Sequence, residues 1–100
     1  MDYFSKVNTA EMMRLANMLG CANIPYDMGE SFGGLHICYP NKEDVVCSVI
    51  QHSFSYGGRD GKLEIMGLLT DEEEECDSVV GWLSAENVFE RISKHFQNNT

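Results

Sequence analysis

The stretch VVCSVIQHSFSYGGRDGKLEIMGLL, residues 45–69, decides the expected fold. Residues 45–56 and 63–69 are rich in β-branched, aromatic and other apolar side chains, a composition typical of strands. Between them stands Asp60-Gly61, a pair preferred in two-residue hairpin turns. The stretch therefore predicts two antiparallel strands joined by a tight turn.

The turn fixes a register for this hairpin. Tyr56 is expected opposite Ile65, and Phe54 opposite Gly67, where an aromatic ring would cover the bare strand backbone. A bulge at the glycine pair 57–58 would shift the pairing by one residue. In the unshifted register, one face carries apolar side chains that should pack on helices: Ile50, Phe54, Tyr56, Leu63, Ile65 and Leu69.

Another strand is expected just before this hairpin. Residues 35–39, LHICY, alternate in polarity and are followed by Pro40, which ends a strand. Residues 40–44 are a polar turn. Residues 22–34 are rich in glycine and are expected to form a loop, with at most a short extended piece.

The N-terminal part predicts an amphipathic helix over residues 9–19. Asn8 and Glu11 have the spacing of a capping box, Val7 is placed for a hydrophobic staple, and Gly20 supplies a stop. The apolar stripe repeats at i, i+3, i+4 and i+7 and consists of Met12, Leu15, Ala16 and Leu19.

In the C-terminal third of the chain, a charged segment is followed by apolar and amphipathic segments. Residues 71–77 hold six acidic side chains, whose mutual repulsion predicts an exposed turn. Residues 79–83 are expected to be a short fourth strand or a buried extended segment. Ser84 is placed to cap a final helix whose apolar face comprises Ala85, Val88, Phe89, Ile92 and Phe96.

These elements predict a single small α+β domain over residues 1–100. The expected order is α-β-β-β-(β)-α, a three- to four-stranded antiparallel sheet with an N-terminal and a C-terminal helix. A chain of this length is enough for one domain.

The charge balance excludes several partners. There are 16 acidic and 7 basic side chains, a net charge of −9, and the basic residues are scattered. Such a surface repels phosphate groups, so direct binding of nucleic acid or of anionic membranes is not expected. The longest apolar stretch is too short to span a bilayer, and the first residues lack signal-peptide features. The expectation is a soluble cytoplasmic protein.

The four cysteines contain no Cys-x-x-Cys pair and are expected to be free thiols. Pairing of Tyr39 with the residue at 46 would place Cys38 opposite Cys47, with His36 on the same face. Zinc accepts such ligands if a fourth, such as Cys76, is added. The spacing matches no zinc finger, so the favoured interpretation is small apolar side chains, without a metal or other cofactor.

No catalytic constellation follows from the spacing. Residues 29–33 match Gly-x-Ser-x-Gly, but that motif needs a preceding strand, a following helix and a large sheet. An enzymatic or ligand-binding alternative would use a pocket between sheet and helices, with His52, Tyr56 and Trp82 as its candidate residues. The acidic run lacks the ligand spacing of an EF-hand.

Two surfaces remain as interaction candidates. The sheet face away from the helices is expected to expose His36, Val49, Met66 and Leu68, beside Cys38 and Cys47, for a homodimer or another protein, unless residues 22–34 cover it. The acidic turn can reach toward a basic surface through Asp71, Glu72, Glu73, Glu74, Glu75 and Asp77.

The function expected from the sequence is a small acidic, non-catalytic module that binds and regulates another protein. The alternatives are an inhibitor that mimics nucleic acid, and the small pocket-bearing domain described above.

Overall fold

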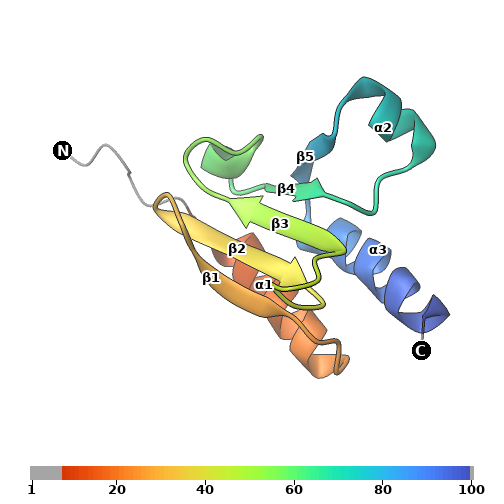
Figure 1. Ribbon diagram of the computed structural model, residues 1–100. Coiled ribbons are helices and arrows are strands. Elements are labelled where there is room, and N and C mark those ends of the chain that lie inside the picture. The colour runs from red at the N-terminus through yellow and green to blue at the C-terminus, as the bar shows by residue number, and fades with distance from the viewer. Residues whose placement is uncertain (1–7, 100) are drawn as a thin grey trace.

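The computed structural model describes residues 8–99 (Figure 1). The elements are α1 (Ala10–Cys21), β1 (Asp27–Ser31), β2 (Gly34–Tyr39), β3 (Cys47–Gln51), the short 3₁₀ helix η1 (Gly58–Asp60), β4 (Leu63–Met66), α2 (Asp71–Cys76), β5 (Val79–Leu83) and α3 (Ala85–Asn98).

The strands form one antiparallel sheet in the order β1-β2-β3-β4-β5. Figure 1 shows α1 and α3 lying against the same face of this sheet. The predicted α+β class and the two flanking helices are confirmed, and the sheet has five strands instead of three or four.

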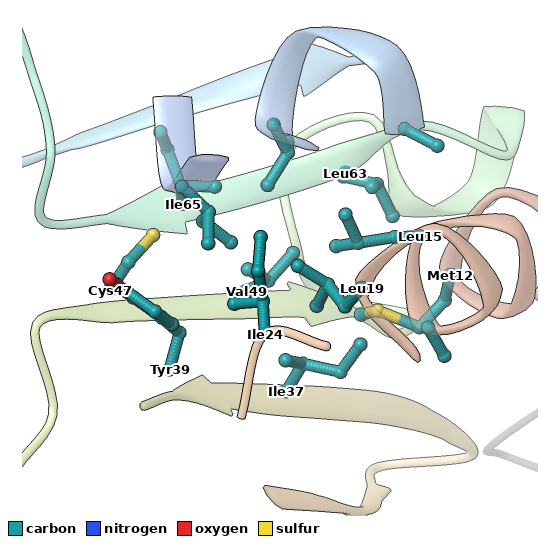
Figure 2. Close-up of a cluster of buried hydrophobic side chains, with 14 residues drawn as sticks. Met12, Leu15, Leu19, Ile24, Ile37, Tyr39, Cys47, Val49, Leu63 and Ile65 are labelled. Carbon is teal, nitrogen blue, oxygen red and sulfur yellow. The ribbon is translucent and has the colours of Figure 1, made fainter. Parts of the chain in front are cut away.

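The core lies between this face and the two helices. Figure 2 shows side chains from α1 and from β2, β3 and β4 meeting in one cluster. Val88 and Ile92 of α3 close it, and both are fully buried. The predicted stripe of α1 is confirmed, because all four of its residues are buried: Met12, Leu15, Ala16 and Leu19.

The ends of α1 differ from prediction. Asn8 Oδ1 accepts the N–H of Ala10 at 3.0 Å, and no capping box forms with Glu11. Gly20 lies inside the helix, and Asn23 takes the left-handed conformation instead, with φ of 58°. Val7, the expected staple residue, lies outside the described residues.

Glu11 of α1 forms a direct contact with α3. Its carboxylate accepts the N–H of Ala85, the first residue of α3, at 2.6 Å, and this bond lowers the pKa of Glu11. Arg14 extends the contact by forming ion pairs with Glu11 and with Glu86. The two helices are thus held together by charge as well as by apolar packing.

Segment 22–34 matches the expectation of a loop with a short extended piece only in part, because that piece is a full strand of the sheet. It contains the edge strand β1 and a two-residue turn, in which Phe32 and Gly33 have φ of 43° and 81°. Positive φ at both turn positions is the type I′ geometry of tight hairpins. The polar and glycine content that favoured a loop is tolerated in β1, because only one of its edges is bonded to the sheet.

The prediction of one long strand over residues 45–56 is wrong. β3 ends at Gln51 and pairs Val49 with Ile65, so the Asp60-Gly61 turn and its register do not form. The hydroxyl of Ser55 accepts the N–H of His52 at 3.0 Å, which bends the chain away from the sheet. Residues 52–62 are therefore a loop, with η1 inside it.

The hairpin before it is shifted by one residue. Tyr39 pairs with Cys47, where Val46 was expected, and Cys38 pairs with Ser48. A one-residue shift turns every side chain of a strand to the other face. Cys47 consequently lies in the core, and Cys38 lies on the opposite face.

The acidic run forms the short helix α2 where an exposed turn was expected, and none of its residues is buried. Thr70 and Glu73 make a capping box that starts it. The strand at residues 79–83 and the final helix are confirmed, and Ser84 Oγ accepts the N–H of Asn87 at 3.2 Å.

Candidate interaction surface

The sheet has an outer face, directed away from α1 and α3. Strand pairing places these residues on it: Asp27, Gly29, Ser31, His36, Cys38, Ser48, Ile50, Glu64, Met66 and Val79.

Only part of the predicted exposed face is found there. His36 and Met66 do lie on the outer face, and Met66 is 57% exposed. Val49 is fully buried, because the register shift turned it toward the helices along with Cys47. Leu68 follows the end of β4 with φ of 56° and packs against the core.

The loop 52–62 is fixed to one end of the outer face. Glu64 of β4 accepts the N–H of Tyr56 at 2.8 Å. Ser55 Oγ donates to the carbonyl of His52 at 3.0 Å, in addition to accepting its N–H. A Cβ on Gly58 would lie 2.1 Å from the same carbonyl oxygen, so only glycine fits there. Side-chain–backbone hydrogen bonds and a close glycine contact therefore set the position of the loop.

This loop carries two of the four exposed aromatic residues that we group as the aromatic surface. The rings of Phe32 and Phe54 meet edge-on with centroids 6.0 Å apart, and the N–H of Trp82 donates to the carbonyl of Tyr56 at 3.2 Å. Each side chain is more than half exposed. The aromatic surface consists of Phe32, Phe54, Tyr56 and Trp82.

Two glycines let these segments approach closely. A Cβ on Gly81 would lie 2.2 Å from Cβ of Tyr56, and a Cβ on Gly57 would lie 3.1 Å from Cα of Trp82. Trp82 itself has φ of 62° and lies where the pairing of β4 with β5 is irregular. This distorted backbone directs the indole outward, where 62% of the residue is exposed.

α2 presents a second, acidic surface at the opposite end of β4. Glu73 forms a bidentate ion pair with Arg91 of α3, with two N···O distances of 2.7 Å. Arg91 also donates to the carbonyl of Leu68 at 3.0 Å. The ion pair lowers the pKa of Glu73 to about 2. The other acidic side chains of the run are exposed: Asp71, Glu72, Glu74, Glu75 and Asp77.

The candidate zinc ligands, which the sequence did not favour as a metal site, are not brought together. Within residues 8–99, no group of three or more His, Cys, Asp or Glu side chains is placed to hold a metal ion. Cys38 and Cys47 lie on opposite faces, and Cys76 is exposed on α2. Burial raises the pKa of the Cys47 thiol to about 12, which disfavours the thiolate that a metal needs. All four cysteines are free.

The candidate catalytic residues make structural contacts. Nδ1 of His52 accepts the N–H of Phe54 at 3.0 Å, and burial lowers the His52 pKa. Ser31 of the Gly-x-Ser-x-Gly motif ends edge strand β1 and leads into a turn, not into a helix. Another histidine, His95, was not a catalytic candidate, and its Nδ1 lies 2.8 Å from the hydroxyl of buried Tyr39.

A pair of hollows lined by described residues lies elsewhere on the surface. One, of about 480 Å³, lies between α3 and residues 68–70 and includes Arg91, Lys94 and His95. The other, of about 750 Å³, lies between α1 and β1. Neither is lined by His52, Tyr56 or Trp82, the residues of the alternative pocket.

Sequence reasoning missed Phe32 and Arg91. Gly33 was a partial turn signal, since glycine suits the second position of this turn, but phenylalanine is not a preferred residue at the first position. Arg91 had no such signal, because its partner Glu73 lies 18 residues away and is brought close only by the fold.

Comparisons with protein-family models, with curated proteins and with solved structures found no match. No helix in the described part of the chain is long and apolar enough to cross a membrane.

Proposed function

We propose that this chain is a non-catalytic protein-binding module, and that its aromatic surface receives a partner segment carrying arginine or lysine side chains. The observation that carries the proposal is the exposure of Tyr56 and Trp82, at 54% and 62%. Both belong to backbone that is fixed by hydrogen bonds and by closely packed glycines. Aromatic side chains held in this way dominate the binding energy of many protein interfaces.

The charge of the chain favours a basic partner. Arginine and lysine side chains bind over aromatic rings through cation–π contacts, most favourably over tryptophan. The net charge of −9 attracts such partners and speeds their encounter. The exposed carboxylates of α2 lie at the far end of the same sheet and add to this field.

The test compares the protein with a Tyr56→Ala/Trp82→Ala variant. Each is tagged and used to capture partners from the lysate of its native host, with nuclease added, and the captured proteins are identified by mass spectrometry. A matched control is Asn17→Ala, an exposed position on α1. We expect a stoichiometric partner that the protein and the control retain and the double variant loses.

Purified partner then permits direct measurement. Calorimetry should give a dissociation constant at least tenfold weaker for the double variant, and weaker binding as salt is added, because exposed charges are screened. A partner that binds the double variant with unchanged affinity would overturn the proposal. A DNA-binding protein released by competing DNA would instead support the nucleic-acid mimic.

A further inference from the structure

Strand β1 ends the sheet, with an edge that no other described strand covers. Ser31 and Gly34 flank the two-residue turn and are paired across it. In such a closing pair, each residue donates its N–H to the C=O of the other. Pairs with and without these mutual hydrogen bonds then alternate along an antiparallel ladder. Ser31, Gly29 and Asp27 therefore direct their backbone groups toward β2, and Met28 and Glu30 direct theirs away from the sheet.

We infer that two copies of this chain pair through β1, antiparallel, about a twofold axis at Gly29. Met28 then lies opposite Glu30 of the second copy, and the outward N–H and C=O groups of both residues bond across the axis. The two five-stranded sheets join into one continuous sheet. The inference does not depend on the proposed function, which rests on the exposure of Tyr56 and Trp82.

Glycine suits the position on the axis. In this register the two Gly29 residues form a pair without mutual hydrogen bonds, the pair type in which Cα atoms approach most closely, at about 4.5 Å. The space beside each Gly29 is taken by its own His36, whose Cε1 would lie 3.0 Å from an added Cβ. The absence of a side chain thus permits both the His36 contact and the close pairing.

The charges of β1 are also compatible with self-pairing. Like charges directly opposite each other destabilise a strand pair. In this register Asp27 lies opposite Ser31 and Glu30 lies opposite Met28, so neither carboxylate faces another. Asp27 already accepts the N–H of Lys42 at 2.8 Å within its own chain.

The hollow between α1 and β1 supplies apolar area on the helix side of this edge. Met13 and Met28 border it and are 49% and 42% exposed, and Tyr26 lies beside them. Arg14 is the only charged residue among those that line it. Interface centres are poor in charge and rich in methionine and aromatic residues. A second copy brings a matching hollow to the same axis.

The test is the oligomeric state, measured by light scattering after size-exclusion chromatography and by sedimentation over a range of concentrations. Glu30→Pro removes the outward N–H together with the carboxylate, and an edge strand tolerates proline within its own sheet. The matched control Glu30→Gln removes the charge and keeps the N–H. We expect a dimer for the protein and for Glu30→Gln, and at least a tenfold weaker dimer for Glu30→Pro.

A crosslink tests the register without proline. Met28→Cys/Glu30→Cys, in a Cys21→Ser/Cys76→Ser background, places cysteines opposite each other across the axis. Mild oxidation should give a covalent dimer, since paired strand positions meet disulfide geometry. A protein that stays monomeric at the highest concentration, a dimer unaffected by Glu30→Pro, or no crosslink would each overturn the inference.

Discussion

Two long connections flank strand β4, and they are attached to the molecule in different ways. Residues 52–62 are fixed by close packing of Gly58 against the His52 carbonyl and by a hydrogen bond from the Tyr56 N–H to the Glu64 carboxylate. Residues 67–78 contain α2, which has no buried residue and is tied to α3 by the ion pair of Glu73 with Arg91.

The difference predicts different responses to conditions. Close packing of glycine and backbone depends on shape and is insensitive to salt and to mild acid. A partly exposed ion pair is weakened by salt and is lost when its carboxylate is protonated. The first connection is therefore a rigid base for the aromatic surface, and the second is an acidic segment whose attachment can be changed separately.

The largest effect is expected from Gly58→Ala. Its Cβ would lie 2.1 Å from the His52 carbonyl oxygen and 2.2 Å from Ser55 Oγ, so the loop must shift. Such overpacking lowers the free energy of unfolding by about 3 kcal/mol. Gly61→Ala is the control: its φ is 76°, but nothing lies near the added Cβ. It should cost about 1 kcal/mol. The free energy of unfolding of both variants is measured by urea denaturation. Equal losses for Gly58→Ala and Gly61→Ala would contradict the packing argument.

The next largest effect is expected from Glu73→Gln. It should lower the free energy of unfolding by about 2 kcal/mol, because the charged pair with Arg91 is lost. Glutamine still suits the capping box that starts α2, so the variant isolates the charge. The pKa of Glu73 is lowered from 4.5 to about 2 in the folded protein. Its stabilisation is therefore present above pH 4.5 and is lost as the pH falls toward 2.

The measurement is the free energy of unfolding between pH 2.5 and 7 at low and high salt. The control Glu72→Gln changes an exposed carboxylate of the same helix. The protein and the control should lose stability between pH 4.5 and 2.5 by more than Glu73→Gln does. Parallel pH profiles for all three would show that the ion pair contributes nothing.

A smaller effect is expected from Glu64→Ala, which removes the acceptor of the Tyr56 N–H. The free energy of unfolding should fall by about 1 kcal/mol, and amide hydrogen exchange should become faster in residues 52–62 alone. Glu64→Gln keeps an acceptor oxygen and should preserve protection. Unchanged exchange in Glu64→Ala would mean that the glycine contacts alone hold the loop.

The smallest effect on stability is expected from Trp82→Ala. Because 62% of the residue is exposed, its removal should change the free energy of unfolding by less than about 0.5 kcal/mol. The melting temperature of the variant checks this. A loss of several kcal/mol would assign Trp82 to the structure and would weaken its place on the aromatic surface.

The sequence predicted the elements whose patterns are local. The stripe from Met12 to Leu19 repeats with the helical period, so α1 followed directly from it, and the serine cap gave the start of α3. The ends and registers of strands were predicted less well. They depend on contacts between distant residues, such as Ser55 with His52 and Gly34 with the Gln51 carbonyl.

The candidate surface was predicted only in part for the same reason. His36 and Met66 were placed correctly, because either register of their strands leaves them on the outer face. Tyr56 was expected in the core, since its apolar ring follows a strand pattern. The structure exposes it, because β3 ends five residues earlier and the loop folds back over Glu64.

The bond between Glu11 and the N–H of Ala85 also bears on how the chain folds during synthesis. The two residues are 74 positions apart, and each helix covers part of the same core. Such distant contacts make folding slow, since a long loop must close before they form. On the ribosome, the part of the core that α3 covers stays exposed until residues 85–92 have been made. The nascent chain therefore depends on its final helix to close the core, and the intervening hairpins are vulnerable to aggregation until that step.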